Sequence, residues 1–187
     1  MRVKITLLQE DINNVSADGL VLPVDGQICV IGGTAAARAF KASFAEEAED
    51  AEEQQELYLY AEEDVQRLQP LPHGKCRIIQ GNDRWPNLVV AAAFYHNVND
   101  VVFTSGQACS LLTNAIRNAV CASAAHGIDS IALTLMGTTY RVSARESIAA
   151  MIAGLAAARR ERIEVKRCIL RDEDYRYTEK MIESLLV

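Results

Sequence analysis

Residues 130–139 read Ser-Ile-Ala-Leu-Thr-Leu-Met-Gly-Thr-Thr, in which a strongly strand-like apolar run leads into the short glycine loop Gly137-Thr138-Thr139. A second loop, Gly32-Gly33-Thr34, runs directly into a helix-like segment. Loops of this kind leave backbone N–H groups free at the positive end of a helix, which is a ready site for a phosphate. Each loop taken alone is more often an ordinary tight turn. Their placement in the chain, described next, favours two loops that clasp the two phosphates of one nucleotide.

The segments around the two loops predict an α/β fold. Alternating or continuous apolar runs indicate strands, and apolar residues three and four apart indicate helices. We therefore expect strands at residues 3–9, 20–24, 76–79, 88–91, 130–135 and 163–170, and helices at residues 35–57, 105–125, 144–160 and 173–186. Strands that alternate with helices and are apolar on both faces predict a three-layer α/β/α sandwich with a mixed, mostly parallel sheet, built as a single domain over residues 1–187. In such sheets ligands bind beyond the carboxyl ends of the strands, where both glycine loops lie.

The composition of the chain argues against nucleic acid and membranes as binding partners. The formal net charge of -6 provides no broad basic field for nucleic acid or for an anionic membrane, and the apolar stretches are too short for a membrane span. The opening residues do not fit a secretory signal, and five scattered cysteines indicate free thiols, so we expect a cytoplasmic protein. The three histidines have no metal-ligand spacing, so we predict neither a metal nor a cofactor. The sequence leaves the oligomeric state open.

Five segments, in this order along the chain, carry a resemblance to a known family. They are residues 5–12 (Ile-Thr-Leu-Leu-Gln-Glu-Asp-Ile), 17–25 (Ala-Asp-Gly-Leu-Val-Leu-Pro-Val-Asp), 32–35 (Gly-Gly-Thr-Ala), 74–76 (Gly-Lys-Cys) and 131–140 (Ile-Ala-Leu-Thr-Leu-Met-Gly-Thr-Thr-Tyr). Over nearly its whole length the chain resembles a macro domain, the ADP-ribose-binding α/β/α module, as a divergent member. The resemblance implies that ADP-ribose or a related adenine nucleotide is the partner.

The resemblance also implies roles for individual residues. Asp11 and Ile12 match the pair that meets adenine, although a turn or helix-cap role for Asp11 stays open. The matches to the two phosphate loops are Gly32, Gly33 and Thr34 for the first, and Gly137, Thr138, Thr139 and Tyr140 for the second. Arg171 falls where the family often has an aromatic residue near adenine, and it is either a stacking guanidinium or a solvated residue at a strand end.

One departure from the family pattern concerns catalysis. The family's second strand usually ends in Asn-Ala-Ala-Asn, whereas residues 22–25 read Leu-Pro-Val-Asp. Asp25 is therefore the candidate catalytic residue, as a general base that activates water. Three functions stay open: a binding module for ADP-ribose or a related nucleotide, an ADP-ribosyl hydrolase that uses Asp25, and a macro-like protein-interaction domain without a ligand.

Overall fold

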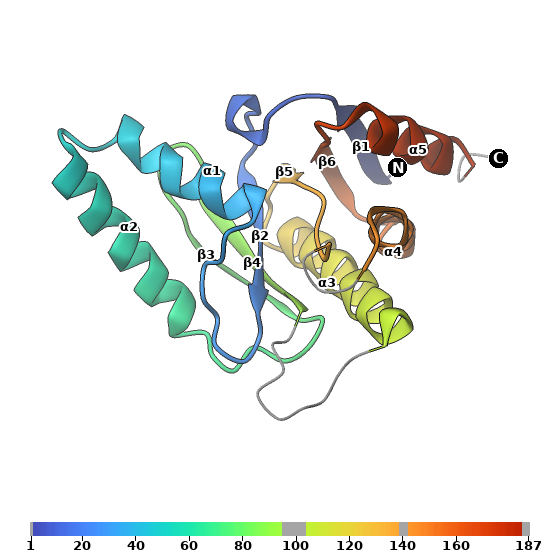
Figure 1. Ribbon diagram of the computed structural model, residues 1–187, viewed down its shortest axis with the longest axis horizontal. Coiled ribbons are helices and arrows are strands. Elements are labelled where there is room, and N and C mark those ends of the chain that lie inside the picture. Colours follow the sequence, from blue (N-terminus) through green and yellow to red (C-terminus); the bar gives the residue numbers. More distant parts are fainter. Residues whose placement is uncertain (1, 95–103, 139–141, 185–187) are drawn as a thin grey trace.

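Six strands form one sheet with helices on both faces in the computed structural model, which describes residues 2–94, 104–138 and 142–184 (Figure 1). The strands are β1 (Arg2–Leu8), β2 (Gly19–Asp25), β3 (Cys76–Gln80), β4 (Asn87–Phe94), β5 (Ser130–Leu133) and β6 (Arg162–Cys168). The helices are α1 (Ala35–Ser43), α2 (Ala51–Gln66), α3 (Ser105–Ala125), α4 (Ala144–Ala157) and α5 (Asp172–Glu183), with two short 3-10 helices, η1 (Ile12–Asn14) and η2 (Phe44–Glu46). The predicted α/β fold is confirmed.

The parallel strands of the sheet have their carboxyl ends along the same edge. The order is β1-β6-β5-β2-β4-β3, and among the described strands every neighbouring pair is parallel except β3–β4. Leu8 at the end of β1 lies opposite Cys168 at the end of β6, so these two strands end at the same level. β2 continues further: Leu20 lies opposite Ala132 of β5, so Val21 is level with Leu133 and Asp25 lies four residues beyond it. The sheet edge is therefore stepped between β5 and β2.

The two helical layers bury the two faces of the sheet. α1 and α2 cover one face, and α3, α4 and α5 cover the other (Figure 1). β2 is buried along its whole length and serves both cores, because alternate side chains point to opposite faces. Leu22 and Val24 pack in the core that contains Phe40 of α1, whereas Val21 packs in the core that contains Ile116 of α3. The continuous apolar run at residues 20–24 was the sequence signal for this doubly buried strand.

The predicted single helix over residues 35–57 is wrong, because the chain forms two helices there. α1 ends at Ser43, and α2 begins after Asp50, whose carboxylate accepts hydrogen bonds from the N–H groups of Glu52 and Glu53, both at 2.9 Å. Between the helices Phe44 turns into the core, with its ring centroid 6.4 Å from that of Tyr58. Asp50 is thus a helix N-cap inside an acidic run. Because the neighbouring residues of that run are also acidic, the local sequence does not single out Asp50 as the cap.

α3 has its predicted bounds, residues 105–125. Its pattern of buried and exposed residues shows how a helix packs on this sheet. Leu112, Ile116 and Val120 are buried along one side, while Asn114 and Arg117 are exposed. This division is that of an amphipathic helix on a protein core. In the part of the chain that the structure describes, no helix combines the length and the apolar character needed to cross a membrane.

Candidate ligand-binding cleft

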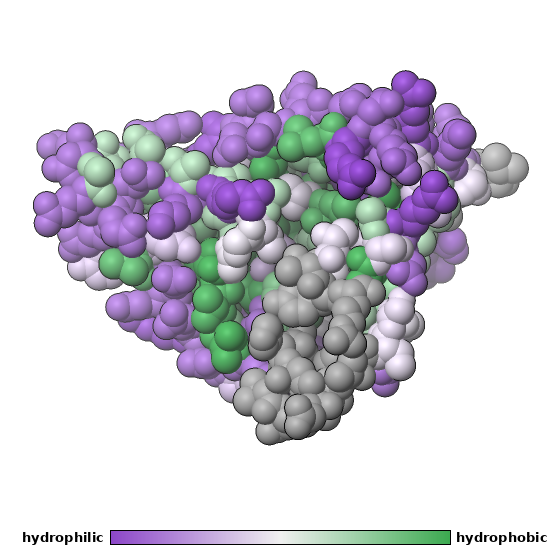
Figure 2. Space-filling view, in the orientation of Figure 1, coloured by the Kyte–Doolittle hydropathy of each residue, from purple (hydrophilic) through white to green (hydrophobic). Residues whose placement is uncertain are grey.

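A cavity of about 230 Å³ lies where β1, β6 and β5 end, and we call it the strand-end cavity. Its lining comes from residues 10–13 after β1, residues 134–135 after β5, residues 168–171 at the end of β6 and beyond it, Asp174 of α5, and Ala35 and Arg38 of α1. Figure 2 shows hydrophobic residues at the surface between the regions of α1 and α5, the two helices whose first turns contribute to the lining. The cavity is therefore at the edge of the sheet where the topology predicted a ligand.

Three of the predicted binding residues line this cavity on the side of the segments that follow β1 and β6, which we call its outer end; the side at the start of α1 is its inner end. Asp11, Ile12 and Arg171 all line it. Asp11 also caps η1, because one of its carboxylate oxygens accepts hydrogen bonds from the backbone N–H of Asn13 at 2.9 Å and from the Asn13 side chain at 2.8 Å. Arg171 is exposed and its Nε lies 3.8 Å from Oδ2 of Asp174. Asp11 is thus a cap residue that also lines the cavity, and its contact with adenine stays a prediction.

The first glycine loop leads into the inner end of the cavity. Thr34 is the N-cap of α1: its hydroxyl accepts from the N–H of Ala37 at 3.2 Å, and its carbonyl accepts from the N–H of Arg38 at 2.9 Å. Gly32 and Gly33 are exposed and do not themselves line the cavity, and an added Cβ at either meets no atom within 4 Å. The loop backbone is therefore open to an approaching group.

The second glycine loop lies outside the cavity lining. Gly137 has φ +88°, a conformation that favours glycine, and Thr138 is exposed. The loop is attached to α4, because the hydroxyl of Ser147 donates a hydrogen bond to the carbonyl of Met136. Thr139 and Tyr140, which were also predicted to bind, lie outside the described residues. A role for this loop in binding therefore stays a prediction.

Asp25 is apart from the strand-end cavity. It is buried, with 4% of its surface exposed, and its Oδ1 accepts a hydrogen bond from the N–H of Gln27 at 2.8 Å. The step in the sheet edge places it beyond the level at which β5 ends, and it is not among the residues that line the cavity. Its charge acts on two neighbours, since it raises the pKa of Cys29 as a lesser cause beside burial and opposes the lowering of the His73 pKa by burial.

Arg38, Thr134 and Asp174 are among the cavity residues that the sequence did not predict as site residues. Thr134 was placed in a strand over residues 130–135, but β5 ends at Leu133 and leaves Thr134 at the cavity. Arg38 had a usable signal, because a residue four positions after an N-cap lies one turn above the cap. Asp174 had none beyond its place in the first turn of the last helix.

The charges around the cavity differ between its two ends. Carboxylates of Glu10, Asp11 and Asp174 gather after β1 and β6 together with the cation Arg171, whereas the Arg38 guanidinium belongs to α1. Burial, together with the charges of Glu10 and Asp11, raises the pKa of the Cys168 thiol to about 12. Cys168 is therefore a neutral thiol at neutral pH and does not supply a nucleophilic thiolate to the cavity.

A buried arginine lies near the outer end of the cavity. Arg167 of β6 has no exposed surface, its Nε and Nη1 atoms have no hydrogen-bond partner among the described residues, and its Nη2 lies 3.7 Å from the sulfur of Met151. Burial lowers its pKa to about 10, and the charge of Asp174 opposes that shift. The guanidinium thus stays protonated at neutral pH, and Asp174, which lines the cavity, is the acid whose charge acts on it.

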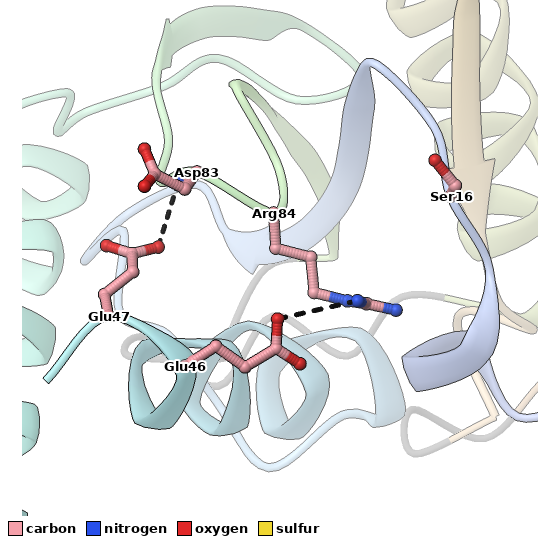
Figure 3. Close-up of a pocket in the computed structure, with 5 residues that line it drawn as sticks. All are labelled: Ser16, Glu46, Glu47, Asp83 and Arg84. Atoms are coloured by element: carbon pink, nitrogen blue, oxygen red, sulfur yellow. Dashed lines mark hydrogen bonds and ion pairs between the residues drawn. The ribbon is translucent and has the colours of Figure 1, made fainter.

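A second hollow, of about 360 Å³, lies between η2, the turn joining β3 to β4, and the segment before β2. Figure 3 shows Arg84 extending across it towards Glu46, to which it is paired at 3.7 Å. Arg84 also donates to the carbonyl of Asn13, and Glu47 accepts from the N–H of Asp83 at 2.9 Å. Arg84, the one cation among the described residues that line this hollow, is thus engaged with Glu46 and Asn13, and we assign no ligand to this hollow. The described residues also contain no group of three potential metal ligands.

Comparisons with solved structures show that the fold of this chain is similar to that of macrodomains. A mutant of the Oceanobacillus iheyensis macrodomain aligns with a TM-score of 0.68 and 19% identity, over 97% of this chain and 92% of that one. The O. iheyensis macrodomain with ADP aligns with a TM-score of 0.67 and 16% identity, over 97% and 91% of the two chains. The Trypanosoma brucei macrodomain in complex with ADP-ribose aligns with a TM-score of 0.64 and 13% identity, over 96% and 69%. No protein-family model and no curated protein matches the sequence, so the likeness is one of fold.

Proposed function

We propose that this chain, which has the macrodomain fold, is a binding module for ADP-ribose or a related adenine nucleotide. The observation that carries the proposal is the strand-end cavity, because Asp11, Ile12 and Arg171 line it together with Ala35, the first residue of the helix that follows the first glycine loop. Solved neighbours of the same fold hold ADP and ADP-ribose. The ligand is a nucleotide whose base lies at the acidic outer end and whose phosphates lie at the start of α1.

The chemistry of each end supports this orientation. At the outer end, the second carboxylate oxygen of Asp11 is left to accept a hydrogen bond from an exocyclic amine, since the bonds from Asn13 use Oδ1. The exposed guanidinium of Arg171 offers a planar surface for stacking on a base. At the inner end, the N–H groups of Ala35 and Ala36 have no hydrogen-bond partner among the residues that the structure describes. Free N–H groups at a helix start are suited to phosphate oxygens.

A thermal-shift titration tests the proposal. Saturation with ADP-ribose at 100 times its dissociation constant stabilises the folded state by about 2.7 kcal/mol, which raises the melting temperature of a domain of this size by roughly 5–10 °C. We expect such a shift with ADP-ribose, a smaller one with ADP and little with AMP at equal concentration. The absence of a shift with ADP-ribose, ADP, AMP and NAD alike at millimolar concentration contradicts the proposal and favours a protein-interaction domain.

Hydrolysis of an ADP-ribosyl ester is the second candidate function, and Asp25 is the observation that favours it. A carboxylate buried at the end of a central strand is suited to accept a proton from water that attacks the anomeric carbon, while the ester carboxylate leaves. For this candidate we expect Asp25→Asn to retain ADP-ribose binding and to slow single-turnover release of ADP-ribose from a modified peptide by about 10²–10⁴-fold. Equal turnover by the variant and the unaltered protein excludes Asp25 as the base.

A further inference from the structure

We propose that Arg38 is a specificity-determining residue that makes the strand-end cavity select ligands with two linked phosphates over those with one. The proposal rests on the proposed function of this cavity. It adds a side chain that neither the glycine loops nor the resemblance to macro domains assigns. Four observations on the described residues support it.

The first observation is the position of the guanidinium. Arg38 is exposed and lines the cavity from α1, and its Nη1 donates a hydrogen bond to the carbonyl of Gly33 at 2.5 Å. The side chain therefore folds back over the start of its own helix and lies against the first glycine loop. No other hydrogen bond or ion pair joins this guanidinium to a described residue, so its remaining N–H groups are available to a ligand.

The second observation is the electrostatic environment of this helix start. The first turn of α1 contains no acidic residue, whereas the first turns of α2 and α5 contain two and three. A cation is disfavoured at the positive end of a helix dipole, and an anion is favoured there. The positively charged guanidinium of Arg38 therefore lies next to the positive end of the α1 dipole. No acidic residue in the first turn of α1 offsets the two. In the protein without ligand these two positive groups repel each other, and a bound dianion reduces that repulsion.

The third observation is an unsatisfied hydroxyl on the same cavity. Thr134 lines the cavity with 6% of its surface exposed, and its Oγ1 has no hydrogen-bond partner among the described residues. A buried hydroxyl without a partner is costly, and a ligand oxygen is one group that can satisfy it. Thr134 follows β5, so it faces the cavity from an element different from α1.

The fourth observation is the distribution of acids, which gives the ligand a direction. The three carboxylates that line the cavity follow β1 and β6, and Arg171 offsets only one of them through its contact with Asp174, so the outer end keeps a negative charge that repels phosphates. The N–H groups at the start of α1 suffice for one phosphate, while the adjacent Arg38 guanidinium adds charge-assisted hydrogen bonds for a second. The contribution of Arg38 is therefore larger for a diphosphate than for a monophosphate.

Calorimetric titration of Arg38→Gln and Arg38→Lys with ADP-ribose, ADP and AMP tests the proposal. We expect Arg38→Gln to weaken binding of ADP-ribose and ADP by about tenfold and binding of AMP by at most about threefold, with Arg38→Lys in between. The matched control is Arg176→Gln, which removes an exposed arginine of α5 that is paired with Asp172 and does not line the cavity. The control should bind all three ligands as the unaltered protein does.

Two results overturn the proposal: equal affinity of Arg38→Gln and the unaltered protein for ADP-ribose and ADP, or an equal loss for ADP and AMP. A parallel thermal-shift series with inorganic pyrophosphate separates this proposal from the proposed function. Stabilisation by pyrophosphate that is lost in Arg38→Gln, without binding of any adenine nucleotide, supports the role of Arg38 and contradicts nucleotide recognition. If neither pyrophosphate nor any nucleotide binds the unaltered protein, both proposals fail.

Discussion

Gly33→Val is expected to weaken ADP-ribose binding by at least about 100-fold while changing the free energy of unfolding by less than about 1 kcal/mol. The fold does not require glycine here, because φ of Gly33 is outside the left-handed region and an added Cβ meets no atom within 4 Å. A phosphate bound to the N–H groups at the start of α1 has to approach this backbone closely. A branched side chain at residue 33 occupies that space and blocks the approach.

The matched control for this prediction is Gly106→Val in the first turn of α3. Gly106 is also exposed, and a Cβ added there likewise meets no atom within 4 Å, but it is remote from the strand-end cavity lining. Calorimetry with ADP-ribose and urea unfolding of both variants give the comparison. Unchanged affinity of Gly33→Val, in a chain that binds ADP-ribose, shows that the phosphates do not approach the first loop.

Arg167→Met and Arg167→Ala are expected to change stability in opposite directions. Methionine keeps most of the volume and removes a buried charge whose Nε and Nη1 lack partners, so we expect about 1–3 kcal/mol of added stability. Asp174 tolerates the loss of that charge because Arg171 lies 3.8 Å from it and because it occupies the first turn of α5. Alanine also removes the packed stem and leaves a cavity, so we expect a loss of about 2–5 kcal/mol.

Urea unfolding at neutral pH measures both variants, and the difference between them separates charge from volume. If Arg167→Met is destabilised as much as Arg167→Ala, the attraction between Arg167 and Asp174 outweighs the cost of burying the guanidinium. Met151 provides a local control, because its sulfur is the neighbour of Arg167 Nη2. Met151→Leu conserves volume and should change stability by less than about 1.5 kcal/mol.

The elements with strong periodic patterns could be predicted from the sequence. The bounds of α3 match because its apolar spacing is regular and Thr104 and Gly127 mark its two ends. The break between α1 and α2 was missed because Asp50, the cap of the second helix, stands among other acids that have no such role. Local sequence shows that an aspartate can cap a helix, but tertiary packing of Phe44 decides where the first helix stops.

Site residues could be predicted from the sequence where the order of the strands alone brings them together. They could not be predicted where the direction of a side chain or the exact end of a strand decides. Asp11, Ile12 and Arg171 follow strands that end side by side, so topology alone brings them together. Arg38 reaches the cavity only because its side chain bends back to the carbonyl of Gly33. Thr134 depends on the residue at which β5 ends. These are side-chain directions and strand lengths, which periodicity does not determine.

The order of the strands determines how far apart two of the candidate site residues, Asp11 and Asp25, lie. Asp25 lies four residues past the level of Leu133, which is about 13 Å along the strands. It is also three strands across from β1, or about 14 Å. Asp11 likewise lies four residues past Leu7, which is level with Leu133 through Arg167, so the distance across the strands sets the separation of the two aspartates. A ligand that touches both Asp11 and Asp25 has to cross about 14 Å of sheet.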